Sequence, residues 1–360
     1  MRRAKLASVP PKNWVVRRAV TADRLKSTVQ SSAANMGAQG YGVGEGLSRQ
    51  RKRKGCIGAG VVYPRRMKRV WIVLAMATGL SIDSFANDEA AVRKLAGEVR
   101  TAYSAGQNDK ALTLAAKLVE LAPKDPLTYM LRGNLHSALR MHAKAVQDFS
   151  KVIEMKPPQG ILADAFQERG ESHFKLAKAK ESVADFDQYL KLNPRRDPHH
   201  WMRGISYYYT KEFKKGYEQF ERHQTVNTND VENAVWHFLC LARAKGIEEA
   251  KKKLIPIVGD GRIPMMEVHA LFAGKSTPEK VLAKSKADGA KGPRLERQLF
   301  YGHLYLGIWY EATGDLKLRD KYIGLAAAVA DNHGYMGDVA RVHAVLNKIK
   351  IPKVDQPKDD

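Results

Sequence analysis

The chain has 360 residues, of which 28% are charged and 44% hydrophobic, and its formal net charge is +23. This length allows two average domains, and the charge at first suggests a nucleic-acid-binding protein. However, residues 1–86 hold 17 Lys and Arg against three acids, a net of +14, which leaves 44 basic and 35 acidic residues and a net of only +9 for the rest. The body is therefore only mildly basic, and we expect no nucleic-acid partner for it.

Residues 1–66 are rich in Arg, Ser and Gly and show no sustained hydrophobic period. We expect this segment to be disordered, or to be an upstream extension that precedes the true translation start at Met67. The alternative is that the basic run Arg51–Lys54 binds nucleic acid or an anionic membrane. In that case the protein would be a cytoplasmic or membrane-associated nucleic-acid-binding protein.

Residues 67–86 have the three parts of a secretory signal peptide. Lys68 and Arg69 form the charged part, Val70–Leu80 is apolar, and Ser84 and Ala86 are the small residues before a cleavage site. The apolar run is too short to cross a bilayer as a helix. No cysteine ends the segment, so a lipid anchor is not indicated. We expect cleavage after Ala86 and export to the periplasm or the medium, although retention of the segment as an anchor remains an alternative.

Residues 92–228 contain a repeat of about 34 residues, the length of one helical hairpin. Apolar spacing predicts helix pairs over 88–121, 126–155, 161–192 and 198–226. Each repeat places a small residue, a packing residue and a proline at fixed intervals. The three sets are Ala111, Ala115 and Pro123; Ala145, Phe149 and Pro157; and, after a three-residue insertion, Ser182, Phe186 and Pro194.

These residues resemble the tetratricopeptide repeat family, in which Gly133 and Gly170 would be the close-packing glycines of the first helices. The fourth unit departs from the pattern at Gly216 and Thr228, and the pattern returns over 300–330. The resemblance implies an all-α fold, a right-handed α-solenoid of helix–turn–helix repeats. Such arrays usually bind other proteins and carry out no chemistry themselves.

The remaining residues complete a predicted repeat domain over 87–350, in which 231–300 is degenerate. Helices are expected at 231–245, 247–254, 265–272 and 278–283, with a closing helix at 338–349. The charged residues 351–360 are expected to form a disordered tail.

The resemblance also implies which residues line the concave groove, because the first helix of each pair faces it. An aromatic set there could bind an extended peptide or a helix, with Trp201 and Tyr208 as the main anchors. The alternative is that Trp201 and Tyr207–Tyr209 form core between repeats. We expect no partner that is recognised through a terminal carboxylate, because Met130 replaces the required lysine and Asp164 and Glu168 replace later cations. The candidate groove residues are Met130, Asn134, Gln167, Glu171, Phe174, Trp201, Ile205, Tyr208 and Tyr209.

No pattern indicates catalysis, a metal or a cofactor. The histidines at 199, 200, 237, 269 and 303 lack the spacing of a metal site. Cys240 would be the only cysteine of an exported chain, which excludes an internal disulfide. The sequence therefore predicts a non-catalytic scaffold or adaptor of the cell envelope with an unidentified protein or peptide partner. A hydrolase with an unrecognised site is the least favoured alternative.

Overall fold

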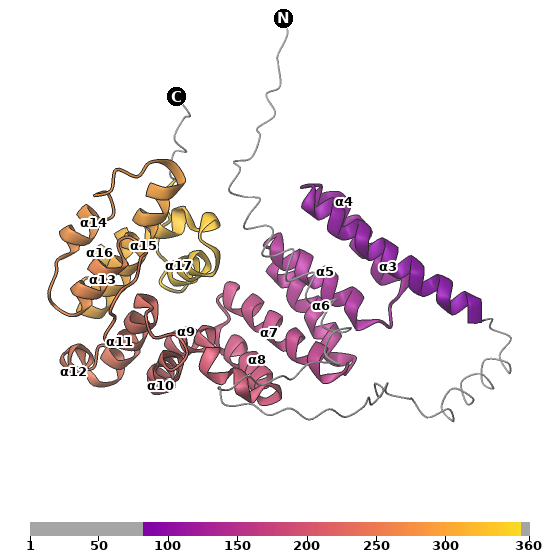
Figure 1. Cartoon of the computed structure of the whole chain (residues 1–360), viewed down its shortest axis with the longest axis horizontal. Helices are drawn as coiled ribbons and strands as arrows, with labels where there is room; N and C mark the ends of the chain where they lie inside the picture. The colour runs from indigo at the N-terminus through magenta and orange to yellow at the C-terminus, as the bar shows by residue number, and fades with distance from the viewer. Residues whose placement is uncertain (1–81, 354–360) are drawn as a thin grey trace, which may run out of the picture. The chain divides into compact units, whose positions relative to one another are not determined.

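The computed structural model describes residues 82–353, which form helices and turns without a strand (Figure 1). This confirms the all-α fold with helix–turn–helix units. The predictions for residues 1–66, for most of the signal segment and for the end of the tail lie outside the described residues. The chain divides into two compact units, 1–132 and 133–360, and each is described by itself.

The first unit contains the hairpin of α3 (Ile82–Ser104) and α4 (Asn108–Leu121). Ala111 and Ala115 are completely buried, as the repeat pattern predicts for small packing residues. The sequence placed the start of this hairpin at residue 88, whereas α3 begins at Ile82. The helix therefore includes the predicted cleavage site. The unit ends within α5 (Pro126–Ala138).

The second unit begins within α5 and contains three helix pairs joined in sequence. They are α5 with α6 (His142–Glu154), α7 (Gln159–Lys175) with α8 (Ala179–Leu192), and α9 (Trp201–Tyr209) with α10 (Phe213–Gln224). A 3₁₀ turn, η1 (Pro194–His199), precedes α9. The predicted pairs over 126–155, 161–192 and 198–226 agree with these bounds within a few residues.

A glycine and a phenylalanine sixteen residues later hold each hairpin together. A Cβ atom on the glycine would lie only 2.7 Å from the ring of the phenylalanine in all three cases, closer than carbon atoms can pack. The helices of each pair therefore meet where the first helix has no side chain. The pairs are Gly133 with Phe149, Gly170 with Phe186, and Gly204 with Phe220.

The turn inside each hairpin contains one residue in the left-handed backbone region. Arg140, Ala177 and Lys211 take this conformation in the three hairpins, with φ values of 61°, 58° and 63°. A residue with a side chain adopts it at some cost, so the tight turn is maintained by the packing of the helices on either side. A histidine–aspartate contact adds to that packing: His136 lies 2.8 Å from Asp148, and His173 lies 2.8 Å from Asp185.

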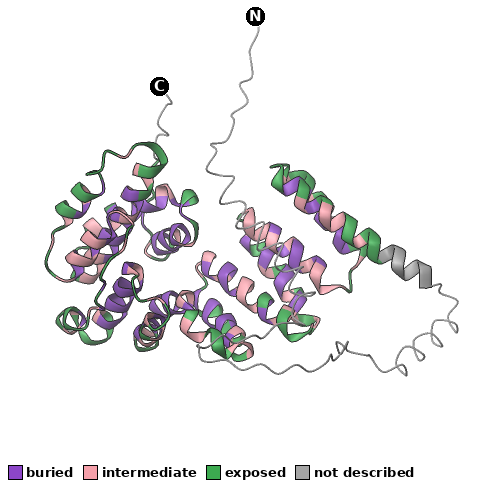
Figure 2. Ribbon diagram, viewed as in Figure 1, coloured by how far each residue is buried: buried purple, intermediate pink, exposed green. Residues whose placement is uncertain are grey.

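The degenerate segment and the last hairpin share one large hydrophobic core with α9 and α10. The segment comprises α11 (Val231–Lys245), α12 (Ile247–Lys252), α13 (Met265–Phe272) and α14 (Pro278–Lys284). The hairpin that follows is α15 (Gly292–Thr313) with α16 (Leu316–Ala328). Figure 2 shows the buried side of these helices facing inward.

The chain's last helix differs from its prediction. After the short turn η2 (Ala330–Asn332), α17 spans Gly334–Leu346, four residues earlier than the predicted start at 338. Gly334 and Lys348 have positive φ values of 56° and 57°, and these mark the two ends of the helix. The shift adds Tyr335 to the helix.

Candidate binding face of the repeats

The candidate groove residues differ in how far the structure buries them. Met130, Phe174, Ile205, Tyr208 and Glu171 are buried, with exposed fractions of 7% or less. Asn134, Gln167, Trp201 and Tyr209 are half-buried. Met130 belongs to the first unit, and all the others belong to the second. We call the side of α7 and α9 that carries Phe174, Trp201 and Tyr209 the first-helix face.

The first-helix face is covered by the chain's own last helix. The ring of Phe174 stacks on Tyr335 of α17, with ring centroids 5.2 Å apart and planes inclined by 13°. Trp201 meets the same Tyr335 ring edge-on, at 5.0 Å and 87°. Tyr209 lies 5.7 Å from Phe174, measured between ring centroids. Phe174, Trp201 and Tyr209 therefore belong to an aromatic cluster, which Tyr335 joins from α17.

A polar chain ties the same face to α15 and α17. The Tyr209 hydroxyl lies 3.1 Å from His343 Nδ1, and His343 Nε2 lies 2.7 Å from a carboxylate oxygen of Glu311. Tyr208 donates a hydrogen bond to Glu311. Burial alone would raise the pKa of Glu311, but the hydrogen bonds and the charges of His343 and Arg319 lower it to about 2. Glu311 therefore remains a carboxylate that connects α9 to the last hairpin.

Ion pairs surround the aromatic contact. Arg140 Nη2 lies 2.7 Å from Asp338 of α17, and Arg140 Nε lies 3.5 Å from Asp331. Lys175 Nζ lies 3.6 Å from Glu171 and 4.0 Å from Asp338. The helix that packs on this face, α17, thus contributes the aromatic ring of Tyr335 and, three residues later, the carboxylate of Asp338. Sequence reasoning missed Arg140, Lys175, Tyr335 and Asp338, since only the folded chain brings them together.

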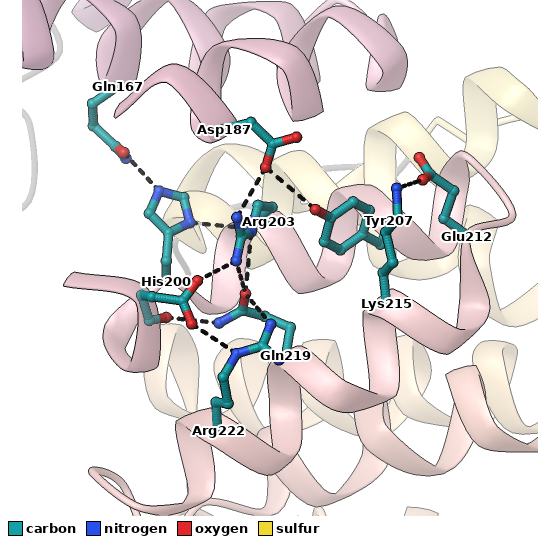
Figure 3. Close-up of polar contacts among 10 residues, drawn as sticks. Gln167, Asp187, His200, Arg203, Tyr207, Glu212, Lys215, Gln219 and Arg222 are labelled. Atoms are coloured by element: carbon teal, nitrogen blue, oxygen red, sulfur yellow. Dashed lines mark hydrogen bonds and ion pairs between the residues drawn. The ribbon is translucent and has the colours of Figure 1, made fainter. Parts of the chain in front are cut away.

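Gln167 takes part in a second network, which joins α7, α8, α9 and α10 (Figure 3). Its Oε1 lies 2.8 Å from His200 Nε2, and its Nε2 donates to Glu171 at 3.1 Å. Arg203 donates to Asp187 at 2.9 Å and to Gln219 at 3.1 Å, and it also pairs with Asp197. These contacts give Gln167 a structural role between repeats.

Neither the histidines nor the cysteine of residues 82–353 belongs to a group of three or more His, Cys, Asp and Glu side chains that could hold a metal ion. Burial lowers the pKa of His200 to about 4, so this ring is neutral at pH 7. Cys240 is completely buried, and burial raises the pKa of its thiol. A buried, protonated thiol is a poor nucleophile.

Three carboxylates gather at the loop between α12 and α13, in which Asp260 lies between Gly259 and Gly261. Arg262 lies 2.6 Å from each of Asp230, Glu232 and Asp260. The guanidinium occupies the position that a bound cation would need, so the cluster joins this loop to α11 as a structural contact.

Comparison with known proteins agrees with this architecture. Residues 127–159, which span α5 and α6, match the family model of the tetratricopeptide repeat. The chain contains a tetratricopeptide repeat. None of the helices of residues 82–353 has the length and apolar content needed to cross a membrane.

Several solved structures are similar to this chain at low sequence identity. A repeat protein from Parabacteroides merdae is 15% identical, with a TM-score of 0.48, over 72% of this chain and 99% of its own. The MamA protein is 16% identical, with a TM-score of 0.41, over 58% and 100%. The C-terminal part of a repeat protein from Cytophaga hutchinsonii is 14% identical, with a TM-score of 0.29, over 68% and 99%.

Proposed function

We propose that this protein is a non-catalytic adaptor of the cell envelope that docks a helical segment of a partner protein on its first-helix face. One observation carries the proposal: the face already receives a helix, α17, through stacked rings and ion pairs. Aromatic rings and arginine are the side chains that concentrate binding energy at protein interfaces. The face therefore has the chemistry that recognition of a helix requires.

The half-buried rim beside α17 is the part of this face that a partner would reach. We place this rim at Asn134, a half-buried candidate groove residue of α5, because the turn that follows α5 holds Arg140, the partner of Asp338 in α17. A partner helix would lie alongside α17 on the rim, or would replace the contacts of Tyr335 in part. The fully buried residues Phe174, Ile205 and Tyr208 would support the rim from below.

Affinity capture from the native cell envelope tests the docking. The full chain should retain a partner protein, and Asn134→Arg should lose it, because a long cation on the rim blocks close approach of a helix. Gln188→Arg is the matched control, since Gln188 is exposed on the second helix of its hairpin. Equal retention by both variants would contradict docking on the first-helix face.

The cellular location rests on the sequence pattern of residues 67–86 and has its own test. N-terminal sequencing of the native protein should give Asn87 as the first residue. An intact Met1 would contradict export. It would not affect the docking proposal, which does not depend on residues 67–86.

A further inference from the structure

A group of exposed cations lies between the end of α13 and the first turns of α15. Figure 2 colours much of α14 and the loop after it green, as exposed. Lys280 and Lys284 are one helical turn apart and so share one side of α14. We call this group the basic patch; it comprises Lys275, Lys280, Lys284, Lys286, Lys291 and Arg297.

Residues 275–297 hold seven cations and three acids, Glu279, Asp288 and Glu296, so the acids neutralise the basic patch only in part. Glu279 is exposed on α14 beside Lys280. Asp288 accepts hydrogen bonds from Arg294, at 2.5 Å, and from Gln298, at 2.8 Å. Glu296 accepts one from Asn332 at 2.8 Å and lies 3.5 Å from His333. Within the described residues, none of the six cations of the patch has an ion-pair partner. Their charge is therefore available to an outside partner.

The side chains of the patch indicate what kind of partner it fits. Lysine is depleted in protein–protein interfaces, which favour aromatic residues, methionine and arginine. Residues 275–297 contain no aromatic side chain on which a nucleic-acid base could stack. Lysine is a flexible point charge without fixed geometry, which suits a surface of many mobile anionic groups.

We infer that the basic patch docks this protein onto an anionic lipid surface through the phosphate groups of the lipids. Each lysine near such a membrane contributes about 1 kcal/mol, which corresponds to about a fivefold change in partitioning. The attraction extends over roughly 10 Å at 0.1 M salt. The interaction is peripheral and requires no membrane-crossing helix. It is independent of the first-helix face and therefore of the proposed partner.

Sedimentation of the full chain with lipid vesicles tests this inference. The vesicles would contain roughly 30% phosphatidylglycerol in phosphatidylcholine, at about 0.1 M salt, where the attraction is not fully screened. The triple variant Lys280→Gln, Lys284→Gln and Lys286→Gln should lower the partition coefficient by about a hundredfold. The matched control is Lys178→Gln, Lys180→Gln and Lys191→Gln, three exposed lysines around α8 whose loss changes the net charge equally.

Because residues 1–81 are identical in both triple variants, the ratio of their partition coefficients isolates the patch. Hydrogen exchange with the same vesicles locates the contact, and protection should appear in 278–297 and not with pure phosphatidylcholine. Equal partitioning of the two triple variants, or no protection in 278–297, would overturn the inference.

Two other anionic ligands, inorganic phosphate and RNA, test whether the patch binds a lipid surface in particular. Inorganic phosphate at constant ionic strength should leave vesicle binding unchanged, because the patch needs many anions on one surface. A single-stranded RNA oligonucleotide should bind the full chain and the patch variant equally. Displacement by phosphate, or RNA binding that depends on the three lysines, would replace the lipid surface by a different partner.

Discussion

At the residue scale, the close-packing glycines make a prediction about stability. Gly170→Ala should lower the free energy of unfolding by about 1–3 kcal/mol, because the new methyl group would overlap the ring of Phe186. Gly160→Ala is the control within the same helix, because a Cβ there meets nothing within 4 Å. That variant should be neutral or slightly stabilising. Urea unfolding measures the free energy of unfolding of both variants. Equal changes in the two would show that helix propensity, and not the contact with Phe186, determines the effect of the substitution.

Two buried histidines predict that the protein loses stability in mild acid. Burial lowers the pKa of His200 and of His142 from 6.5 to about 4. Between pH 6.5 and pH 4 these histidines bind more protons in the unfolded chain than in the folded one. The free energy of unfolding therefore falls as the pH falls from 6.5 to 4. His200 alone should contribute on the order of 3 kcal/mol to that loss.

The variant His200→Asn separates this effect from general acid unfolding. Asparagine keeps an acceptor for the backbone N–H of Arg203, which His200 caps at the start of α9, but it does not titrate. Urea unfolding across pH 7 to 4 should show a shallower decline for the variant. A decline as steep as that of the original chain would mean that His200 does not take up a proton on unfolding.

At the element scale, α17 should be an integral part of the second unit. Tyr335→Ala removes the half-buried ring that contacts Phe174 and Trp201, and it should lower the free energy of unfolding by about 1–3 kcal/mol. Val345 of the same helix is 62% exposed, so Val345→Ala should change stability by less than about 0.5 kcal/mol. Hydrogen exchange should rise in α7 and α9 for Tyr335→Ala. Unchanged exchange there would show that α17 does not hold the first-helix face.

Most helices could be predicted because their evidence is local. The apolar period and the turns gave α11 and α13 with the same bounds as in the structure. The start of α17 was missed because it depends on the positive φ of Gly334, a conformation that no hydrophobic pattern reveals. For the first-helix face, the repeat register could select only residues of the repeats themselves, such as Phe174, Trp201 and Tyr209. The helix that covers this face, α17, was not predicted to lie there. Its contacts join residues that are far apart in the sequence, as Arg140 and Asp338 are, at 198 positions.

At the scale of the whole molecule, we propose separate roles for the repeats, the covering helix and the basic patch. The hairpins build the first-helix face, and α17 shows which chemistry that face accepts. The basic patch lies on α14, its loops and the start of α15, which carry none of the candidate groove residues. An adaptor of this kind could hold a protein partner and an anionic surface at the same time, and loss of one interaction should leave the other intact.

The most direct test of the central claim is photo-crosslinking in living cells, with a photoreactive amino acid placed at Asn134 on the rim or at Gln188 on α8. We predict a covalent adduct with a partner protein from position 134 and none from position 188, because only the first-helix face docks a partner. Adducts of equal yield from both positions, or none from position 134, would contradict the assignment of this face as the binding surface.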